Sequence, residues 1–142
     1  MTEKPLFSVV YYLIKKLTDF QVIDGENIPA AGGLLMTTNH LSRLDLPILM
    51  ATSDRHDLVA VVAKKYEKKP FFKWILEKIS TVIWLDRETT DFSALRQVVN
   101  CLRMGNIVGI APEGTRSHHS VGLLEAKQGA AVFAAQASVP IL

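Results

Sequence analysis

The chain has 142 residues, of which 49% are hydrophobic and 21% are charged, and this length fits one domain. Such a composition supports a buried core and excludes disordered and collagen-like proteins. The only cysteine, Cys101, cannot form an internal bridge, which excludes a disulfide scaffold, and a net charge of +2 gives no general grip on nucleic acid. Nucleic acid is therefore not an expected partner.

The first predicted element is an amphipathic helix over residues 6–20, where apolar side chains recur at spacings of three and four. Two interpretations stay open for it. Its apolar face packs on the domain, or it lies in a membrane interface, aided by Tyr11, Tyr12 and two lysines. The sequence lacks the roughly 18 uninterrupted apolar residues of a spanning helix and the features of a signal peptide. We therefore expect residues 1–24 to be a retained helical segment on the cytoplasmic side, peripheral to a membrane.

Short apolar runs alternate with helical patterns in the rest of the chain. The runs bounded by glycine or polar residues predict strands over residues 34–38, 58–63, 79–85 and 107–111. The periodic segments predict helices over residues 46–52, 70–78, 92–104 and 126–137. This alternation predicts an α/β fold with a mostly parallel central sheet flanked by helices. A further strand has only begun at residues 139–142, so we expect a domain over 25–142 that is truncated at its C-terminal side.

Charged side chains follow each predicted strand. They are His40 and Asp45 after the first strand, Lys64 and Lys65 after the second, Asp86 and Arg87 after the third, and residues 112–117 after the fourth. In open parallel sheets, ligands bind beyond the carboxyl ends of the strands. One rim thus gathers a histidine, carboxylates and cations, which suits proton transfer beside an anionic substrate.

His40 and Asp45 are candidates for a proton-transfer pair. Residues five apart lie about 140° apart around an α-helix, so His40 must precede the helix if the two side chains are to meet. The carboxylate can then hold one ring nitrogen and leave the other as a general base. Asp45 also fits an N-cap or first-turn acid, because Ser42 and Asp45 resemble a capping box. The two roles are compatible.

The turn after the fourth predicted strand contains Glu113, Gly114, Thr115 and Arg116. Arginine can hold a phosphate with two parallel hydrogen bonds, and glycine lets the backbone approach a ligand closely. The same residues fit an ordinary polar turn, and Arg87 fits an exposed ion pair with a neighbouring acid.

Residues 64–74 interleave five lysines with aromatic side chains. A phospholipid surface suits this pattern, with the lysines at head groups and Tyr66, Phe71 or Trp74 at the interface. An ordinary basic helix face with buried aromatic residues suits it as well. Motifs for a serine nucleophile, a phosphate-binding loop or a zinc site do not occur, and the adjacent His118 and His119 are expected to be solvated.

Three blocks stand in a fixed order along the chain. They are Asn39-His40-x4-Asp45, then Pro70 to Trp74 running on to Leu85-Asp86-Arg87, and finally Pro112 to Ser117, with a further block beginning at Val139-Pro140-Ile141. In residues and order they resemble the glycerolipid acyltransferases typified by 1-acylglycerol-3-phosphate acyltransferase. The match runs from about residue 25 to the last residue.

The resemblance implies an acyltransferase domain in which His40 is the base and Asp45 its partner. It further implies that the substrate phosphate is bound by Arg87, Glu113, Gly114, Thr115 and Arg116. The implied reaction moves an acyl group from acyl-CoA or an acyl carrier protein to the free hydroxyl of 1-acylglycerol-3-phosphate, giving phosphatidic acid. It implies no cofactor and no metal. The alternative that stays open is a phospholipid-surface binding module without turnover, since the fourth block is incomplete.

Overall fold

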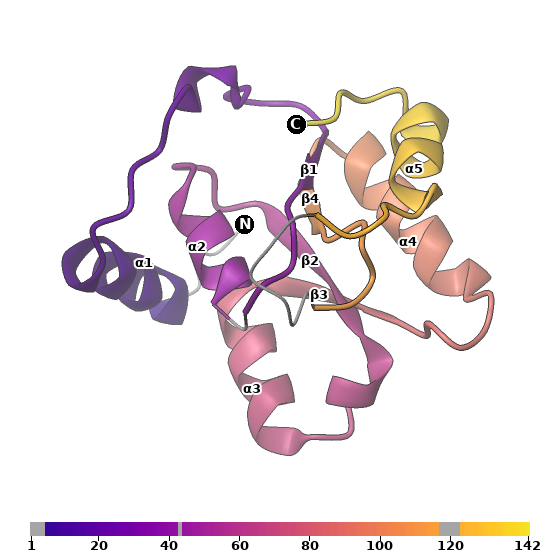
Figure 1. The fold of residues 1–142 in the computed structure, drawn as a ribbon, viewed down its shortest axis with the longest axis horizontal. Helices are drawn as coiled ribbons and strands as arrows, with labels where there is room; N and C mark the ends of the chain where they lie inside the picture. Colours follow the sequence, from indigo (N-terminus) through magenta and orange to yellow (C-terminus); the bar gives the residue numbers. More distant parts are fainter. Residues whose placement is uncertain (1–4, 43, 117–122) are drawn as a thin grey trace.

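A computed structural model describes residues 5–42, 44–116 and 123–142 (Figure 1). Within these residues, four parallel strands form a sheet in the order β1-β4-β2-β3. The strands are β1 (Leu34–Thr37), β2 (Leu58–Ala63), β3 (Thr81–Leu85) and β4 (Ile107–Ile110). The predicted α/β fold with a parallel sheet is confirmed.

Helices cover both faces of the sheet (Figure 1). One face packs against α2 (Asp45–Ala51) and α3 (Pro70–Ile79), with α1 (Pro5–Leu17) packed on both of these helices. The other face packs against α4 (Phe92–Arg103) and α5 (Gly129–Ala137). Two short 3-10 helices, η1 (Gly25–Asn27) and η2 (Lys64–Tyr66), lie in the connections. None of the described helices is long and apolar enough to cross a bilayer.

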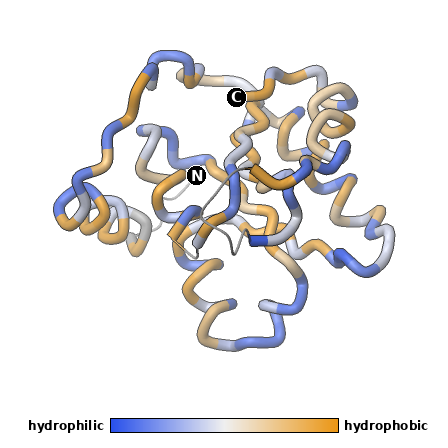
Figure 2. Tube along the Cα trace, viewed as in Figure 1, coloured by the Kyte–Doolittle hydropathy of each residue, from blue (hydrophilic) through white to orange (hydrophobic). Residues whose placement is uncertain are grey.

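Strand β1 shows how the sequence divides between the two faces. Leu34 and Met36 belong to the core under α2 and α3, whereas Leu35 belongs to the core under α4 and α5. Successive side chains of a strand point to opposite faces, so a strand covered on both sides is apolar throughout. Figure 2 accordingly shows the most hydrophilic stretches on the peripheral turns.

The third strand begins later than predicted, because Ile79 belongs to the last turn of α3. Ser80 ends that helix: its backbone N–H donates to the Leu76 carbonyl at 2.9 Å, and its hydroxyl donates to the Leu58 carbonyl at 2.9 Å. An apolar run alone does not distinguish the end of a buried helix from the start of a strand.

Three other boundaries also differ from the predictions. Helix α1 ends at Leu17 rather than at residue 20, and the Ile14 carbonyl accepts hydrogen bonds from both the backbone N–H and the hydroxyl of Thr18, at 3.1 and 2.6 Å. Helix α5 begins at Gly129 rather than at residue 126, since the preceding Lys127 N–H donates to the Pro112 carbonyl at 3.0 Å. Residues 139–142 form a single parallel bridge to β1 instead of a full strand.

Arg55 connects the loops at the amino ends of the strands. Its guanidinium donates to the carbonyls of Pro29, Gly32 and Gly105 at 3.0, 2.9 and 2.7 Å. The same group pairs with Asp57, to which Nε donates at 3.0 Å. Because the Arg55 side chain is only 10% exposed, these contacts replace its hydration and fix the loops before β1, β2 and β4.

Candidate functional site

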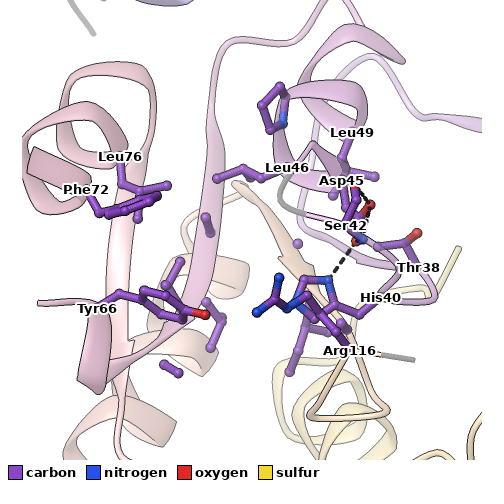
Figure 3. Close-up of a pocket in the computed structure, with 18 of the residues that line it drawn as sticks. Thr38, His40, Ser42, Asp45, Leu46, Leu49, Tyr66, Phe72, Leu76 and Arg116 are labelled. Carbon is purple, nitrogen blue, oxygen red and sulfur yellow. Dashed lines mark hydrogen bonds and ion pairs between the residues drawn. The ribbon is translucent and has the colours of Figure 1, made fainter. Parts of the chain in front are cut away.

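A cavity of about 350 Å³ lies on the α2 and α3 side of the sheet, at the carboxyl ends of the strands (Figure 3). Its polar lining comes from residues that follow the strands or begin α2: Thr38, His40, Ser42, Asp45, Lys65, Tyr66, Arg87, Thr115 and Arg116. Its apolar lining extends back along β2 from Ala63 to Ala60 and faces Leu46, Leu49, Phe72, Ile75, Leu76 and Ile79. The cavity therefore joins a polar end to an apolar arm.

His40 and Asp45 meet at the polar end. His40 lies in the turn after β1 and Asp45 is the first residue of α2, so the two side chains face each other across the turn. His40 Nδ1 lies 2.6 Å from Asp45 Oδ2. With Nδ1–H donating to the carboxylate, the neutral ring keeps its Nε2 lone pair available as an acceptor.

The Asp45 carboxylate accepts three further hydrogen bonds. The backbone N–H groups of Leu41 and Ser42 donate to it at 2.9 and 3.1 Å, and the Ser42 hydroxyl donates at 2.9 Å. Burial acts to raise the pKa of Asp45, but the bonds from His40, Ser42 and Leu41 outweigh it and lower this pKa below its ordinary value. The carboxylate is thus held ionised against the ring.

The N-cap interpretation of Asp45 is half right. The N-cap position is occupied by Leu44, so Asp45 is a first-turn acid rather than the cap. Its carboxylate reaches back to the Ser42 N–H, which is one of the two bonds of a capping box. One side chain therefore ends the turn and orients the histidine.

Glu113 supports the turn that carries His40. It is 7% exposed, its Oε2 accepts the His40 backbone N–H at 3.3 Å, and its Oε1 accepts the Leu124 N–H at 3.2 Å. Both carboxylate oxygens therefore accept hydrogen bonds from backbone N–H groups. Glu113 does not belong to the cavity lining, so the structure does not place it where a bound phosphate would lie. This geometry connects the loop after β4 to the loop after β1.

Two arginines bring positive charge to the cavity. Arg87, after β3, donates to the Gly114 carbonyl, and Arg116 lies beside His40 in Figure 3. Loss of water around the Arg87 guanidinium lowers its pKa, yet an arginine remains charged at neutral pH. Gly114 has a φ of +69° and the Lys127 side chain packs where a Cβ would lie, at 3.1 Å, so a side chain would be strained there.

Tyr66 was not among the predicted site residues, and Lys65 was named only as one of the cations after the second predicted strand, yet both line the cavity. The structure divides the aromatic residues of segment 64–74: Tyr66 and Phe72 line the cavity, whereas Phe71 and Trp74 are 66% and 54% exposed. Of the three aromatic residues named for an interface, Phe71 and Trp74 are thus the exposed ones, and the interface itself stays a prediction. The signal for Tyr66 at the cavity was available, because Tyr66 directly follows β2 at the ligand-binding end of the sheet.

The structure gives no test of the expectation that His118 and His119 are solvated. His118 and His119, like Ser117, lie outside the described residues. In the part of the chain that the structure describes, no three His, Cys, Asp or Glu side chains gather at metal-binding distances.

Comparison with known proteins gives matches of sequence and of fold. Residues 19–142 match the family model described as Acyltransferase. A 1-acyl-sn-glycerol-3-phosphate acyltransferase of Bacillus subtilis (strain 168) is 28% identical over 122 residues, which make up 86% of this chain and 59% of that protein. The crystal structure of the 1-acyl-sn-glycerophosphate (LPA) acyltransferase PlsC from Thermotoga maritima matches 99% of this chain and 56% of its own, with a TM-score of 0.71 and 22% identity. The chain thus spans somewhat more than half the length of these relatives.

Proposed function

The chain belongs to the acyltransferase family, and from this premise we propose that it transfers a fatty acyl group from an acyl thioester to the free hydroxyl of 1-acylglycerol-3-phosphate, giving phosphatidic acid. The observation that carries the proposal is the His40–Asp45 pair beside Arg116, in a cavity with an apolar arm. The two similar acyltransferases, from Bacillus subtilis and Thermotoga maritima, are named for the same acceptor, which supports this choice.

His40 acts as the general base in the proposed reaction. Its Nε2 takes the hydroxyl proton while the hydroxyl oxygen attacks the thioester carbonyl carbon. The new C–O bond forms, the C–S bond breaks, and the imidazolium returns its proton to the departing thiolate. Asp45 holds the ring orientation and stabilises the imidazolium, because its ionised carboxylate lies 2.6 Å from Nδ1.

Arg87 and Arg116 bind the acceptor phosphate in this proposal, with Thr115 as a further donor. All three line the cavity at the end that contains His40. The acceptor carries its hydroxyl and its phosphate on neighbouring glycerol carbons, so a base and the phosphate-binding cations must lie close together. Glu113 and Gly114 contribute by shaping the loops that present these side chains.

The apolar arm holds the acyl chain of the donor. The side chains from β2, α2 and α3 that line it are aliphatic or aromatic, and each methylene transferred from water gains about 0.8 kcal/mol. Gly109 of β4 lets Leu49 of α2 pack closely on the strand, since a Cβ there would lie 2.8 Å from Leu49 Cδ2.

A membrane surface is the proposed place of work, because both the acceptor and the product are lipids. Helix α1 packs on the domain through Leu6 and Val10, whereas Tyr12 and Leu17 are 59% and 75% exposed. Lys15 and Lys16 lie in the last turn of the same helix, next to these exposed side chains. We propose that residues 1–24 rest on the cytoplasmic face of an anionic bilayer, and that 25–142 are the acyltransferase domain.

The test replaces His40 with alanine in the full chain. Acyl transfer from octanoyl-CoA to 1-acylglycerol-3-phosphate should fall by about 10²- to 10⁴-fold, because the general base is lost. His56→Ala is the matched control, since His56 is an exposed histidine before β2, at the opposite end of the sheet. Circular dichroism should show the same fold in all three proteins. An unchanged rate in His40→Ala would overturn the assignment.

The second candidate function is phospholipid binding without turnover. The exposed apolar side chains of α1 favour it independently of the cavity. Co-sedimentation with anionic vesicles, together with no acyl transfer from any thioester donor, would establish this function in place of the first.

A further inference from the structure

The positive charges around the cavity fall into two groups. Arg116 lies beside His40 in Figure 3, and Arg87, which also lines the cavity, donates to the Gly114 carbonyl in the loop that carries Arg116. The second group is the segment 64–69, here named the lysine turn, which carries four exposed lysines: Lys64, Lys65, Lys68 and Lys69. The proposed function uses the first group and leaves the second without a role.

The lysine turn keeps a strong positive charge. Its one carboxylate, Glu67, pairs with Lys73 at 3.4 Å, outside the turn, and Lys73 also lies 3.8 Å from Glu77. The Glu67 carboxylate thus pairs with a lysine of α3 rather than with the four lysines of the turn. A cluster of ammonium groups of this kind attracts phosphate, since lysine binds phosphate as a point charge.

Tyr66 connects the lysine turn to the cavity. The ammonium nitrogens of Lys65 and Lys69 lie 5.5 and 5.9 Å from the centre of the Tyr66 ring, an attractive placement for a cation. Tyr66 and Lys65 both line the cavity, and Figure 3 shows the Tyr66 hydroxyl directed toward His40 and Arg116. The lysine turn is therefore part of the rim of the reaction cavity.

The two substrates of the proposed reaction differ in where their phosphates lie. In the acceptor, the phosphate is adjacent to the reacting hydroxyl, which matches Arg116 beside His40. In an acyl donor, the phosphate lies at the far end of the pantetheine arm from the thioester. A donor that places its thioester at His40 therefore needs a second group of cations, removed from the first and reached along the cavity rim.

We propose that Lys65 and Lys69, positioned on Tyr66, bind the phosphate of the pantetheine arm of the acyl donor. This inference rests on the proposed function and extends it to the donor. The shared chemistry is a phosphorylated pantetheine thioester, which both acyl-CoA and a loaded carrier protein possess. Tyr66 and Lys65 both line the cavity, and the Tyr66 hydroxyl is directed toward His40 and Arg116 in Figure 3, which favours such a threaded ligand over a flat lipid surface.

The experiment reverses both charges in the variant Lys65→Glu/Lys69→Glu of the full chain. KM for octanoyl-CoA should rise about tenfold or more, with little change in kcat or in the KM of the acceptor. KM for octanoyl-pantetheine, which has no phosphate, should stay the same or fall. The control variant Lys78→Glu/Arg96→Glu makes the same change in net charge on exposed parts of α3 and α4, and should leave every KM unchanged.

A third donor separates the two sources of the phosphate. If the variant raises the KM of octanoyl-4′-phosphopantetheine as much as that of octanoyl-CoA, the arm phosphate accounts for the effect and a carrier protein would use the same contact. If the KM of octanoyl-CoA rises more, the nucleotide phosphates of CoA also bind the turn. Both results support the proposal.

Two results would overturn it. One is that the variant changes the KM of octanoyl-CoA and the KM of octanoyl-pantetheine equally, or changes neither. The other is weaker co-sedimentation with phosphatidylglycerol vesicles while the KM of octanoyl-CoA is unchanged, which would assign the turn to the membrane. Calorimetric titration with CoA alone keeps this test separate from the proposed function. Should the wild type transfer no acyl group, tighter CoA binding by wild type than by the variant would still support the site, and equal binding would reject it.

Discussion

Two arginines at opposite ends of the sheet differ in their partners. At the amino ends of the strands, Arg55 donates to three backbone carbonyls and to Asp57. At the carboxyl ends, Arg116 lines a cavity and has no hydrogen-bond partner among the described residues. Arg87 lies between these cases, because it lines the same cavity and donates to one carbonyl, that of Gly114. An arginine whose donors all meet protein acceptors is structural, whereas one with donors left toward a cavity can bind a ligand.

The largest effect is expected for Arg55→Ala, which tests the amino end. Removing the guanidinium leaves three carbonyls and one carboxylate without their donor, and should lower the free energy of unfolding by about 3 kcal/mol. The melting temperature should fall by roughly 10 °C. Where both proteins are folded, kcat should be unchanged. Arg96→Ala, at an exposed position of α4, is the control. A stable variant with reduced kcat would contradict the division between the two ends.

A smaller effect is expected for Glu113→Gln at the carboxyl end. The amide keeps one acceptor but turns an NH₂ group toward a backbone N–H, so the free energy of unfolding should fall by about 2 kcal/mol. As a positioning residue for His40, it should lower kcat about tenfold and leave the acceptor KM nearly constant. Glu125→Gln, exposed nearby, should change neither. A higher acceptor KM at constant stability would instead indicate direct contact with the substrate.

The smallest effect is expected for the stability of Asp45→Asn. The folded state lowers the pKa of Asp45 below its ordinary 3.8, so the ionised carboxylate stabilises the fold above that pH, and this stabilisation is lost as the pH falls through the lower value. The variant should be about 1 kcal/mol less stable at neutral pH, and the difference should narrow in acid below 3.8. Urea unfolding at both pH values measures this, with the exposed Asp19→Asn as control. A difference independent of pH would show that the charge is not responsible.

Much of the fold followed from local patterns. The run from Leu58 to Ala63 is apolar without interruption, as a strand covered on both faces must be, and β2 has these bounds. The contact between His40 and Asp45 could be predicted as well, because the two residues are only five positions apart in the sequence. Local signals were sufficient wherever both partners lay within one turn.

The rest depended on pairs that are distant in sequence. Glu113 reaches the His40 backbone only because β4 lies next to β1. The periodicity of apolar residues predicts strands and helices but not the order of the strands in the sheet. Arg55 meets Gly105 because β4 also lies next to β2.

The neighbouring position of β1 and β4 has a consequence for the order in which the protein assembles. Their register joins Leu34 to Ile107, so β1 has no neighbour in the sheet until the chain up to β4 is present, whereas β2 and β3 pair across one short helix. Contacts of large sequence separation form late and slowly. His40 follows β1 and Arg116 follows β4, so the proposed base and the proposed phosphate-binding arginine come together only in this last step. In a chain emerging from the ribosome, β2 and β3 can therefore pair before His40 and Arg116 can meet.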